Sequence, residues 1–482
     1  MVDDLLYANG IDGDTGEYLL EPQTYDQFLD YIRGRPVDKP ILEFLTNIWS
    51  SISKKHLGLP DGLHADDVKQ AGWGVIFHSE EDEEVKNALQ PLVDHRKKQV
   101  GDDRLVKVLQ YSGERDWKRW LAENGVAPGS VEPHLVPFYL LIVGSPEKIP
   151  YWFSRLLDVE YAVGRLHFER VDGYKNYVKS LIEYETGDDV ANSREAVFFA
   201  TRHEDDEATK MSADNLVIPL TDGIPEDGGV PAQTPVTENS DFHLRKLWGD
   251  RATKSALTDI FTPAVGEQPP AFLFTATHGV GFKKRKDEQF SRQGALVCQE
   301  WPGEGTFRQQ DYFAAENLTP DSRLHGLISF NFACYSAGTP MYDQYMHIRG
   351  ADPRLIADKP FVAALPKAML SHPNGGALAV IGHVDRTWSS SFMVSRQRSL
   401  VQPFRNAILR ILDGKPIGYT MKDFNERFAA YSAGLSERLE MLGWNQSVSE
   451  SELVRDWLLR NDAGGYLILG DPAASLCLDK LI

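Results

Sequence analysis

Two segments of this 482-residue chain place a reactive side chain directly after an apolar run of strand length. The run AFLFTATHG ends on His278 and Gly279, and the run LISFNFACYSAG carries Cys334, followed by Tyr335 and then by small residues. Because the carboxyl ends of parallel strands line a common crevice, we expect the imidazole and the thiol to meet there. An imidazole can take the proton of a thiol and return it to a leaving amine. The N–H groups of Gly279 and Cys334 would then form an oxyanion hole.

Each of these residues also has a structural interpretation. A cysteine at the end of an apolar strand, taken alone, is usually a buried core thiol, and a single His-Gly pair after a strand is no more specific. The pairing of the two at strand ends favours a catalytic function for His278 and Cys334. The other two cysteines, Cys298 and Cys477, have no such neighbours, and we expect them to be structural.

The elements that must position this pair follow from the pattern of the chain. From residue 72 onward, short apolar runs alternate with stretches of helical periodicity, which predicts an α/β fold with mostly parallel sheets covered by helices. A polar stretch from Thr186 to Ser193 is the expected boundary between two subdomains. The predicted organisation is an N-terminal extension over 1–70, a leading α/β subdomain over 71–190 and a catalytic subdomain over 191–482.

Composition excludes several classes of protein. The net charge is −19 at pH 7, which opposes binding to nucleic acid and to acidic membrane surfaces. The three cysteines are too few for a disulfide framework and suit a reducing compartment. The chain opens without the basic and apolar regions of a secretory signal and has no long apolar run, so a cytoplasmic location is expected. The sequence indicates no cofactor and no metal site.

The two reactive segments resemble the His-Gly and Ala-Cys motifs of caspase-fold peptidases. A longer series resembles the gingipain family: LIVGSPEKIP, VGRL, LIEYE, ALAVIGHVDRTWSSSF, IGYTMKDF and LGDPAASL follow one another as their counterparts do in gingipains. The resemblance runs from about Gly72 to Leu478. It implies a caspase-like three-layer α/β/α sandwich in two adjacent subdomains, with Trp388 lining the S1 pocket. The His-to-Cys separation is longer than in gingipains, and the calcium sites of the family cannot be transferred by motif.

The resemblance implies a cysteine endopeptidase acting on protein or peptide substrates. In the acidic loop RHEDDEATK, Glu204 is the candidate that orients the histidine, and Asp205 or Asp206 is the candidate floor of S1. A solvated acidic turn remains the alternative for each. An acidic floor favours Arg or Lys at P1. Arg202 and Arg386 support the opposite preference, for an acidic P1 as in caspases.

The basic run KKRK, from Lys283 to Lys286, follows the histidine within a long insertion. Such a run is often only a solvated loop. With a basic P1, it would also be a site for cleavage by the enzyme itself or by an upstream protease, and we hypothesise latency until the loop around 283–292 is cut. Two rival functions stay open: a catalytically silent interaction module, and a thiol acyltransferase using the same two residues.

Overall fold

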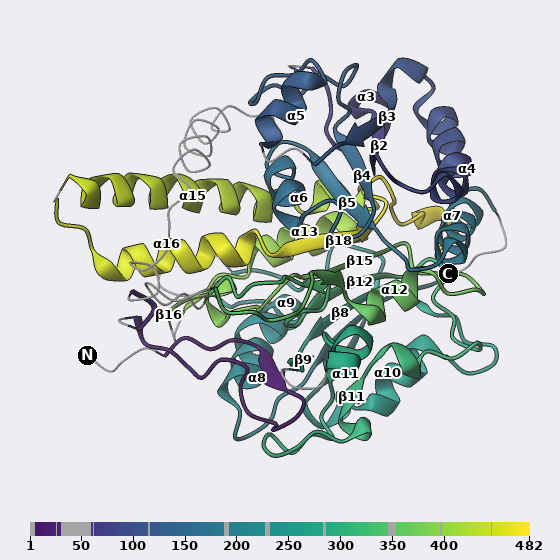
Figure 1. The fold of residues 1–482 in the computed structure, drawn as a ribbon. Coiled ribbons are helices and arrows are strands. Elements are labelled where there is room, and N and C mark those ends of the chain that lie inside the picture. The colour runs from purple at the N-terminus through teal and green to yellow at the C-terminus, as the bar shows by residue number, and fades with distance from the viewer. Residues whose placement is uncertain are drawn as a thin grey trace.

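The computed structural model describes residues 5–25, 27–29, 59–60, 62–113, 116–187, 192–226, 232–282, 286–345, 353–395, 398–444 and 446–482. Their main feature is one ten-stranded sheet in the order β3-β2-β4-β5-β18-β15-β12-β8-β6-β7 (Figure 1). Strand β18 runs antiparallel to β15, and every other neighbouring pair is parallel. The predicted α/β class with mostly parallel strands is confirmed. The two predicted subdomains share this single sheet.

The first half of the sheet comes from residues 73–166. Its strands are β2 (Trp73–His78), β3 (Val106–Tyr111), β4 (Tyr139–Val143) and β5 (Ala162–Leu166). Its helices are α3 (Val68–Ala71), α4 (Glu83–Val100), α5 (Trp117–Glu123), α6 (Tyr151–Leu157) and α7 (Val171–Thr186). Helices α4 and α7 cover one face of these strands, and α5 and α6 cover the other (Figure 1). The predicted boundary at residue 190 lies outside the described residues.

The second half contains the strands that end at His278 and Cys334. Its strands are β6 (Ser193–Ala200), β7 (His243–Trp248), β8 (Pro270–Ala276), β12 (Ile328–Phe332), β15 (Ala379–His383) and β18 (Tyr466–Gly470). Its helices are α8 (Glu207–Ser212), α9 (Ile218–Asp222), α10 (Lys254–Phe261), α11 (Lys286–Arg292), α12 (Ala364–Leu370), α13 (Gln402–Leu412) and α14 (Ile417–Thr420). Helices α15 (Lys422–Gly443) and α16 (Glu450–Ala463) form a long pair that projects from the body (Figure 1).

The central strands are mostly apolar and are buried along their whole length, because helices cover both faces of the sheet. Every residue of β4, β8 and β12 is buried. This pattern explains why the alternation of apolar runs in the sequence predicted these strands. Within the described residues, no helix is both long and apolar enough to cross a membrane.

A smaller sheet brings the start of the chain to the second half. It consists of β1 (Gly10–Asp12), β9 (Gly279–Gly281), β10 (Leu296–Val297) and β11 (Tyr312–Phe313), with β1 parallel to β9. Two short pairs complete the strands: β13 (Gly338–Thr339) with β14 (Phe361–Val362), and β16 (Met393–Ser395) with β17 (Arg398–Ser399). We call residues 5–25 the leading segment. It lies beside β9 and α8 (Figure 1).

A buried ionic cluster joins the first α/β part of the chain to the turn after β18. Asp471, in the turn after β18, accepts hydrogen bonds from the Nε of Arg96 at 2.9 Å and from the indole of Trp73 at 2.9 Å. Arg96 also donates two hydrogen bonds to Glu185, at 2.7 and 2.8 Å. The side chains of Arg96 and Asp471 have no exposed area. The cluster therefore ties β2, α4 and α7 to the turn after β18, the last strand along the chain.

Removing one member of this cluster should leave a buried charge unpaired. We expect Asp471→Ala to lower the free energy of unfolding by about 3–5 kcal/mol, measured by urea denaturation. Arg119→Ala is the control, because Arg119 pairs with Glu123 at the surface and such pairs contribute about 1 kcal/mol or less. Equal losses in the two variants would contradict a structural contribution from the buried cluster.

Candidate active site

The register of two adjacent strands brings His278 and Cys334 to one edge of the sheet. Strands β8 and β12 are parallel neighbours, and Ala276 pairs with Phe332 at their ends. His278 and Cys334 each lie two residues beyond that pair. Both side chains are completely buried. Strand register thus places both residues directly after the carboxyl ends of neighbouring strands.

Two backbone N–H groups converge on one oxygen beside the thiol. Gly279 and Cys334 both donate to the carbonyl oxygen of Asn9, at 3.1 and 3.4 Å. The close approach requires glycine at position 279, because a Cβ there would lie 1.8 Å from the carbonyl oxygen of Cys334. A pair of donors aimed at one carbonyl oxygen is the arrangement of an oxyanion hole.

A buried carboxylate holds the imidazole. The Nε2 of His278 lies 2.7 Å from Asp206 Oδ2, and Asp206 also accepts hydrogen bonds from Tyr18 and Thr209. Burial alone would raise the pKa of Asp206, but the charge and hydrogen bond of His278, with those of the two hydroxyls, lower it well below its usual range. The other ring nitrogen, Nδ1 of His278, has no hydrogen-bond partner among the described residues. It is therefore the nitrogen available for proton transfer.

The thiol of Cys334 is held by backbone contacts in an apolar setting. The N–H of Thr387 donates to Sγ at 3.2 Å, and Leu19 and Tyr335 pack against the cysteine. Burial raises the pKa of the Cys334 thiol to about 12, although hydrogen bonds from Thr387 act in the opposite direction. In this arrangement the sulfur is protonated at neutral pH.

Backbone strain is concentrated at this site. Among the described residues, the two non-glycine residues with positive φ are Tyr335, at 58°, and Asp385, at 83°. Tyr335 follows the cysteine directly, and its N–H donates to the carbonyl of Asp385 at 2.7 Å. Strained conformations of this kind persist where the surroundings hold them and often mark functional sites.

The acidic loop places its three carboxylates differently from the prediction. Glu204, the predicted orienting residue, is exposed, and so is Asp205. The carboxylate on His278 is Asp206, which the sequence had suggested as a floor of S1. The orienting position therefore belongs to Asp206 and not to Glu204.

Of the remaining predicted residues, Trp388 and Arg202 are described in the structure, and most of the basic run is not. Trp388 is buried, with its ring 5.2 Å from those of Phe28 and Tyr345, and its backbone forms an antiparallel bridge with Ala8. The side chain of Arg202 is partly exposed and pairs with Asp214. Residues 283–285 of the basic run lie outside the described residues.

The other two cysteines have no comparable setting. Cys298 is buried in the main core and Cys477 is partly exposed, and neither forms a disulfide. The described residues contain no cluster of His, Cys, Asp or Glu that could hold a metal ion. The sequence did not indicate Asn9 and Tyr18, because residues 1–70 carry no recognisable motif. Thr387 directly precedes Trp388 in a segment that resembles gingipains, but it acts through its backbone N–H, which no side-chain motif marks.

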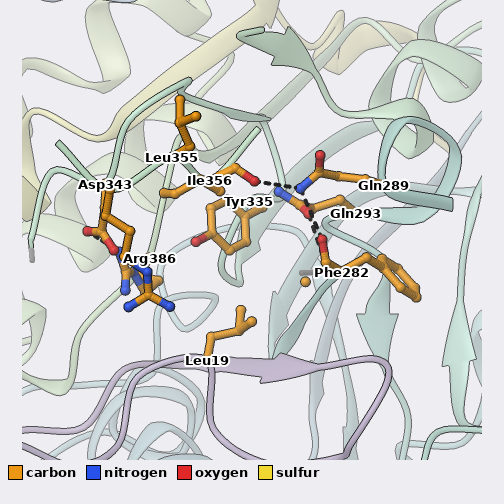
Figure 2. Close-up of a pocket in the computed structure, with 11 residues that line it drawn as sticks. Leu19, Phe282, Gln289, Gln293, Tyr335, Asp343, Leu355, Ile356 and Arg386 are labelled. Atoms are coloured by element: carbon orange, nitrogen blue, oxygen red, sulfur yellow. Dashed lines mark hydrogen bonds and ion pairs between the residues drawn. The ribbon is translucent and has the colours of Figure 1, made fainter. Parts of the chain in front are cut away.

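A pocket is lined in part by Tyr335 and Leu19 (Figure 2), the two residues that pack against Cys334. On one side, Gln289 donates to the carbonyl oxygens of Phe282 and Ile356, at 3.0 and 2.9 Å. On the other side, Arg386 is ion-paired with Asp343 and Asp385. The pocket is lined by Leu19, Gly281, Phe282, Gln289, Gln293, Tyr335, Asp343, Arg354, Leu355, Ile356 and Arg386.

No protein-family model and no curated protein matches this chain. Among solved structures, it is similar to one described only as a protease, with 11% identity, a TM-score of 0.47 and coverage of 84% of this chain and 78% of that one. It is also similar to the Arg-specific cysteine proteinase gingipain R, with 13% identity, a TM-score of 0.41 and coverage of 84% and 78%. A third likeness is to the complex of the pro- and mature domains of RgpB from Porphyromonas gingivalis, with 13% identity, a TM-score of 0.37 and coverage of 84% and 80%.

The two gingipain structures belong to the family that the sequence motifs resemble. At these identities and TM-scores the likenesses are weak.

The protonated, covered thiol should react slowly with alkylating agents. At pH 8 we expect iodoacetamide to modify Cys334 at least about 100-fold more slowly than free cysteine, with a rate that rises about tenfold per pH unit from pH 7 to 10. Mass spectrometry of the peptide that contains Cys334 measures the rate. A plateau across this range would show that the sulfur is already a thiolate.

Proposed function

We propose that this chain is a cysteine endopeptidase in which Cys334 is the nucleophile and His278 transfers the proton. The observation that carries the proposal is the convergence of the Gly279 and Cys334 N–H groups on one carbonyl oxygen next to the thiol. The substrates are proteins or peptides, since the oxygen bound at this point is that of a peptide carbonyl.

The reaction follows from the positions of these groups. Sγ of Cys334 attacks the carbonyl carbon while its proton moves to Nδ1 of His278. The oxygen gains negative charge and accepts from the two N–H groups. The imidazolium then protonates the leaving amine, and the acyl group remains on sulfur as a thioester. Water, deprotonated by His278, hydrolyses the thioester to a carboxylate and the free thiol.

Asp206 acts on this sequence through the histidine. By accepting the hydrogen bond from Nε2, it keeps the proton of the neutral ring on that nitrogen and leaves Nδ1 open. It also stabilises the imidazolium that forms when the thiol loses its proton. Asp206 is thus a positioning residue.

A charged P1 preference has weak support from the predicted residues. The Asp206 carboxylate is bonded to His278, Tyr18 and Thr209, and Asp205 is exposed. These two were the basis for a preference for Arg or Lys. Of the two arginines that favoured an acidic P1, Arg386 is ion-paired with Asp343 and Asp385 and Arg202 pairs with Asp214.

The same residues permit two other functions. A silent interaction module would keep the fold without using the thiol, and an acyltransferase would pass the thioester to an amine and not to water. The His278–Asp206 contact and the filled oxyanion hole favour catalysis over the first. Product analysis separates hydrolysis from transfer.

Replacement of the nucleophile and of the positioning carboxylate should separate their contributions. We expect Cys334→Ala to abolish hydrolysis of a peptide library, and Asp206→Asn to lower kcat/KM by about 100-fold or more. Cleavage is measured by mass spectrometry of the products, and even a slow wild-type rate suffices for the comparison. Glu204→Gln is the control and should hydrolyse at the wild-type rate. Hydrolysis that persists in Cys334→Ala would refute the assignment.

We also propose that a cut in the loop around 283–292 by an upstream protease raises activity. Residues 286–292 form α11, and Gln289 of this helix fixes the wall of the pocket beside Leu19. A cut before α11 would loosen that wall.

Limited digestion with trypsin tests this form of activation. Cleavage between 283 and 286, located by mass spectrometry, should raise the rate of peptide hydrolysis at least about fivefold, because a freed α11 no longer fixes the wall beside Leu19. Replacing Lys283, Lys284, Arg285 and Lys286 by Gln should remove the increase. An unchanged rate after complete cleavage at this loop would exclude activation there.

A further inference from the structure

The leading segment runs through the site with its backbone paired on both sides. The N–H of Asn9 donates to the carbonyl of Thr387 at 3.0 Å, and the N–H of Ser389 donates to the carbonyl of Tyr7 at 3.0 Å. Between them, Ala8 and Trp388 form an antiparallel bridge. Residues 7–9 are thus bound as an added strand, which is how extended peptides bind to exposed edges.

Pairing continues beyond the thiol on the other side. Strand β1 lies parallel to β9, with Gly10 opposite Gly279. The N–H of Gly13 then donates to the carbonyl of Gly281 at 2.7 Å. The backbone of the leading segment is therefore paired both before and after the point where it passes Cys334, and this pairing fixes its register.

That register puts the peptide bond between Asn9 and Gly10 on the catalytic pair. The carbonyl oxygen of Asn9 receives the N–H groups of Gly279 and Cys334. Gly10 faces the sulfur so closely that a Cβ added to it would lie 3.0 Å from Sγ. In a peptidase these are the positions of the P1 carbonyl and of the P1′ residue.

We propose that residues 7–12 lie in the catalytic cleft as a peptide substrate would, with Asn9 in the S1 position, and that they keep Cys334 from other substrates until they are displaced. This inference rests on the proposed function and specifies its substrate class: peptides with an uncharged amide side chain at P1 and a small residue at P2.

The side chain of Asn9 supports both parts of the inference. It is completely buried, and neither its amide nitrogen nor its amide oxygen has a hydrogen-bond partner among the described residues. An unpaired buried amide costs free energy that water would recover. The S1 position therefore takes an uncharged side chain, and release of the segment is favoured by hydration of this amide. The residue before it, Ala8, is buried in one cluster with Trp388 and Tyr345, which limits P2 to a small side chain.

The rest of the leading segment closes the cleft. Its chain turns back so that the N–H of Leu19 donates to the carbonyl of Gly10 at 2.9 Å. Leu19 then packs on Cys334 and Tyr335. Figure 2 shows the Leu19 side chain extending from the purple ribbon of the leading segment toward the pocket. Tyr18 binds Asp206. With Cys334 fully covered, a second peptide cannot reach the sulfur while the segment is in place.

Displacing the segment in the full-length chain tests the proposal. Ala8→Asp puts a charge into the cluster around Trp388, and Leu19→Asp puts one over the thiol, so each should expel the segment. Glu17→Ala is the matched control, because the Glu17 side chain is exposed on the same turn. The substrates are acetyl-Tyr-Ala-Asn, acetyl-Tyr-Ala-Arg and acetyl-Tyr-Ala-Asp, each linked to a fluorogenic amine.

We expect both aspartate variants to hydrolyse the Asn substrate at least 10-fold faster than the wild type and Glu17→Ala, and at least 10-fold faster than the Arg and Asp substrates. Iodoacetamide should also label Cys334 at least 10-fold faster in the aspartate variants. Labelling of Cys298, in the main core, reports unfolding and should not change. If an aspartate variant exposes Cys298, Gly10→Ala replaces it, since the added Cβ meets Sγ and Leu19.

The outcomes separate this inference from the proposed function. Equal labelling and equal hydrolysis in the wild type and the variants would overturn the occupied cleft. A preference for Arg or Asp at P1 would overturn the position given to Asn9 while leaving a peptidase. Faster labelling of Cys334 without hydrolysis of any substrate would support the displaced segment and refute the peptidase.

Discussion

The register between β8 and β12 is the constraint on which the site depends. Neighbouring parallel strands with evenly spaced hydrogen bonds bring residues at equal offsets to the same height, so His278 and Cys334 emerge together because Ala276 pairs with Phe332. The close approach of Gly279 to the carbonyl of Cys334 then sets the separation of the two N–H donors. A slip of one residue in this pairing would turn the reactive side chains to opposite faces. The apolar residues of both strands, buried against helices on each side, hold that register.

The sequence was sufficient to predict these strands but not their neighbours. Strands such as β4, β8 and β12 are buried at every residue because both faces of the sheet are covered, and the largely apolar runs that result are a local signal. The position of β18 is not local: a strand from the end of the chain lies between β5 and β15 and makes one sheet of what appeared to be two subdomains. Strand β1 has only three residues and pairs with β9 more than 250 positions away. Nothing in residues 1–70 indicated that pairing.

In the acidic loop, the sequence also contained a signal for which of the three carboxylates contacts the histidine. Of Glu204, Asp205 and Asp206, the structure brings only Asp206 to the histidine, because α8 begins at the next residue and Asp206 caps it by accepting from the N–H of Thr209 at 3.1 Å. An aspartate before a helix, with a threonine three positions later, is a recognisable start of a helix. That cap fixes one carboxylate of the three, and the fixed carboxylate is the one that can hold an imidazole.

The leading segment that covers Cys334 also makes its sulfur less reactive, because it excludes water from the thiol. The leading segment removes water from the sulfur, and burial then raises the pKa of the thiol to about 12. It also buries the amide of Asn9, which has no hydrogen-bond partner in the part of the chain that the structure describes. Departure of the segment would hydrate both groups at once: the amide regains hydrogen bonds with water, and the pKa of the thiol falls, so that it gives its proton to His278 more readily. Part of the site is held by contacts outside the leading segment: Asp206 is bonded to Thr209 of α8, Gly279 lies on β9, which also pairs with β10, and Cys334 follows β12.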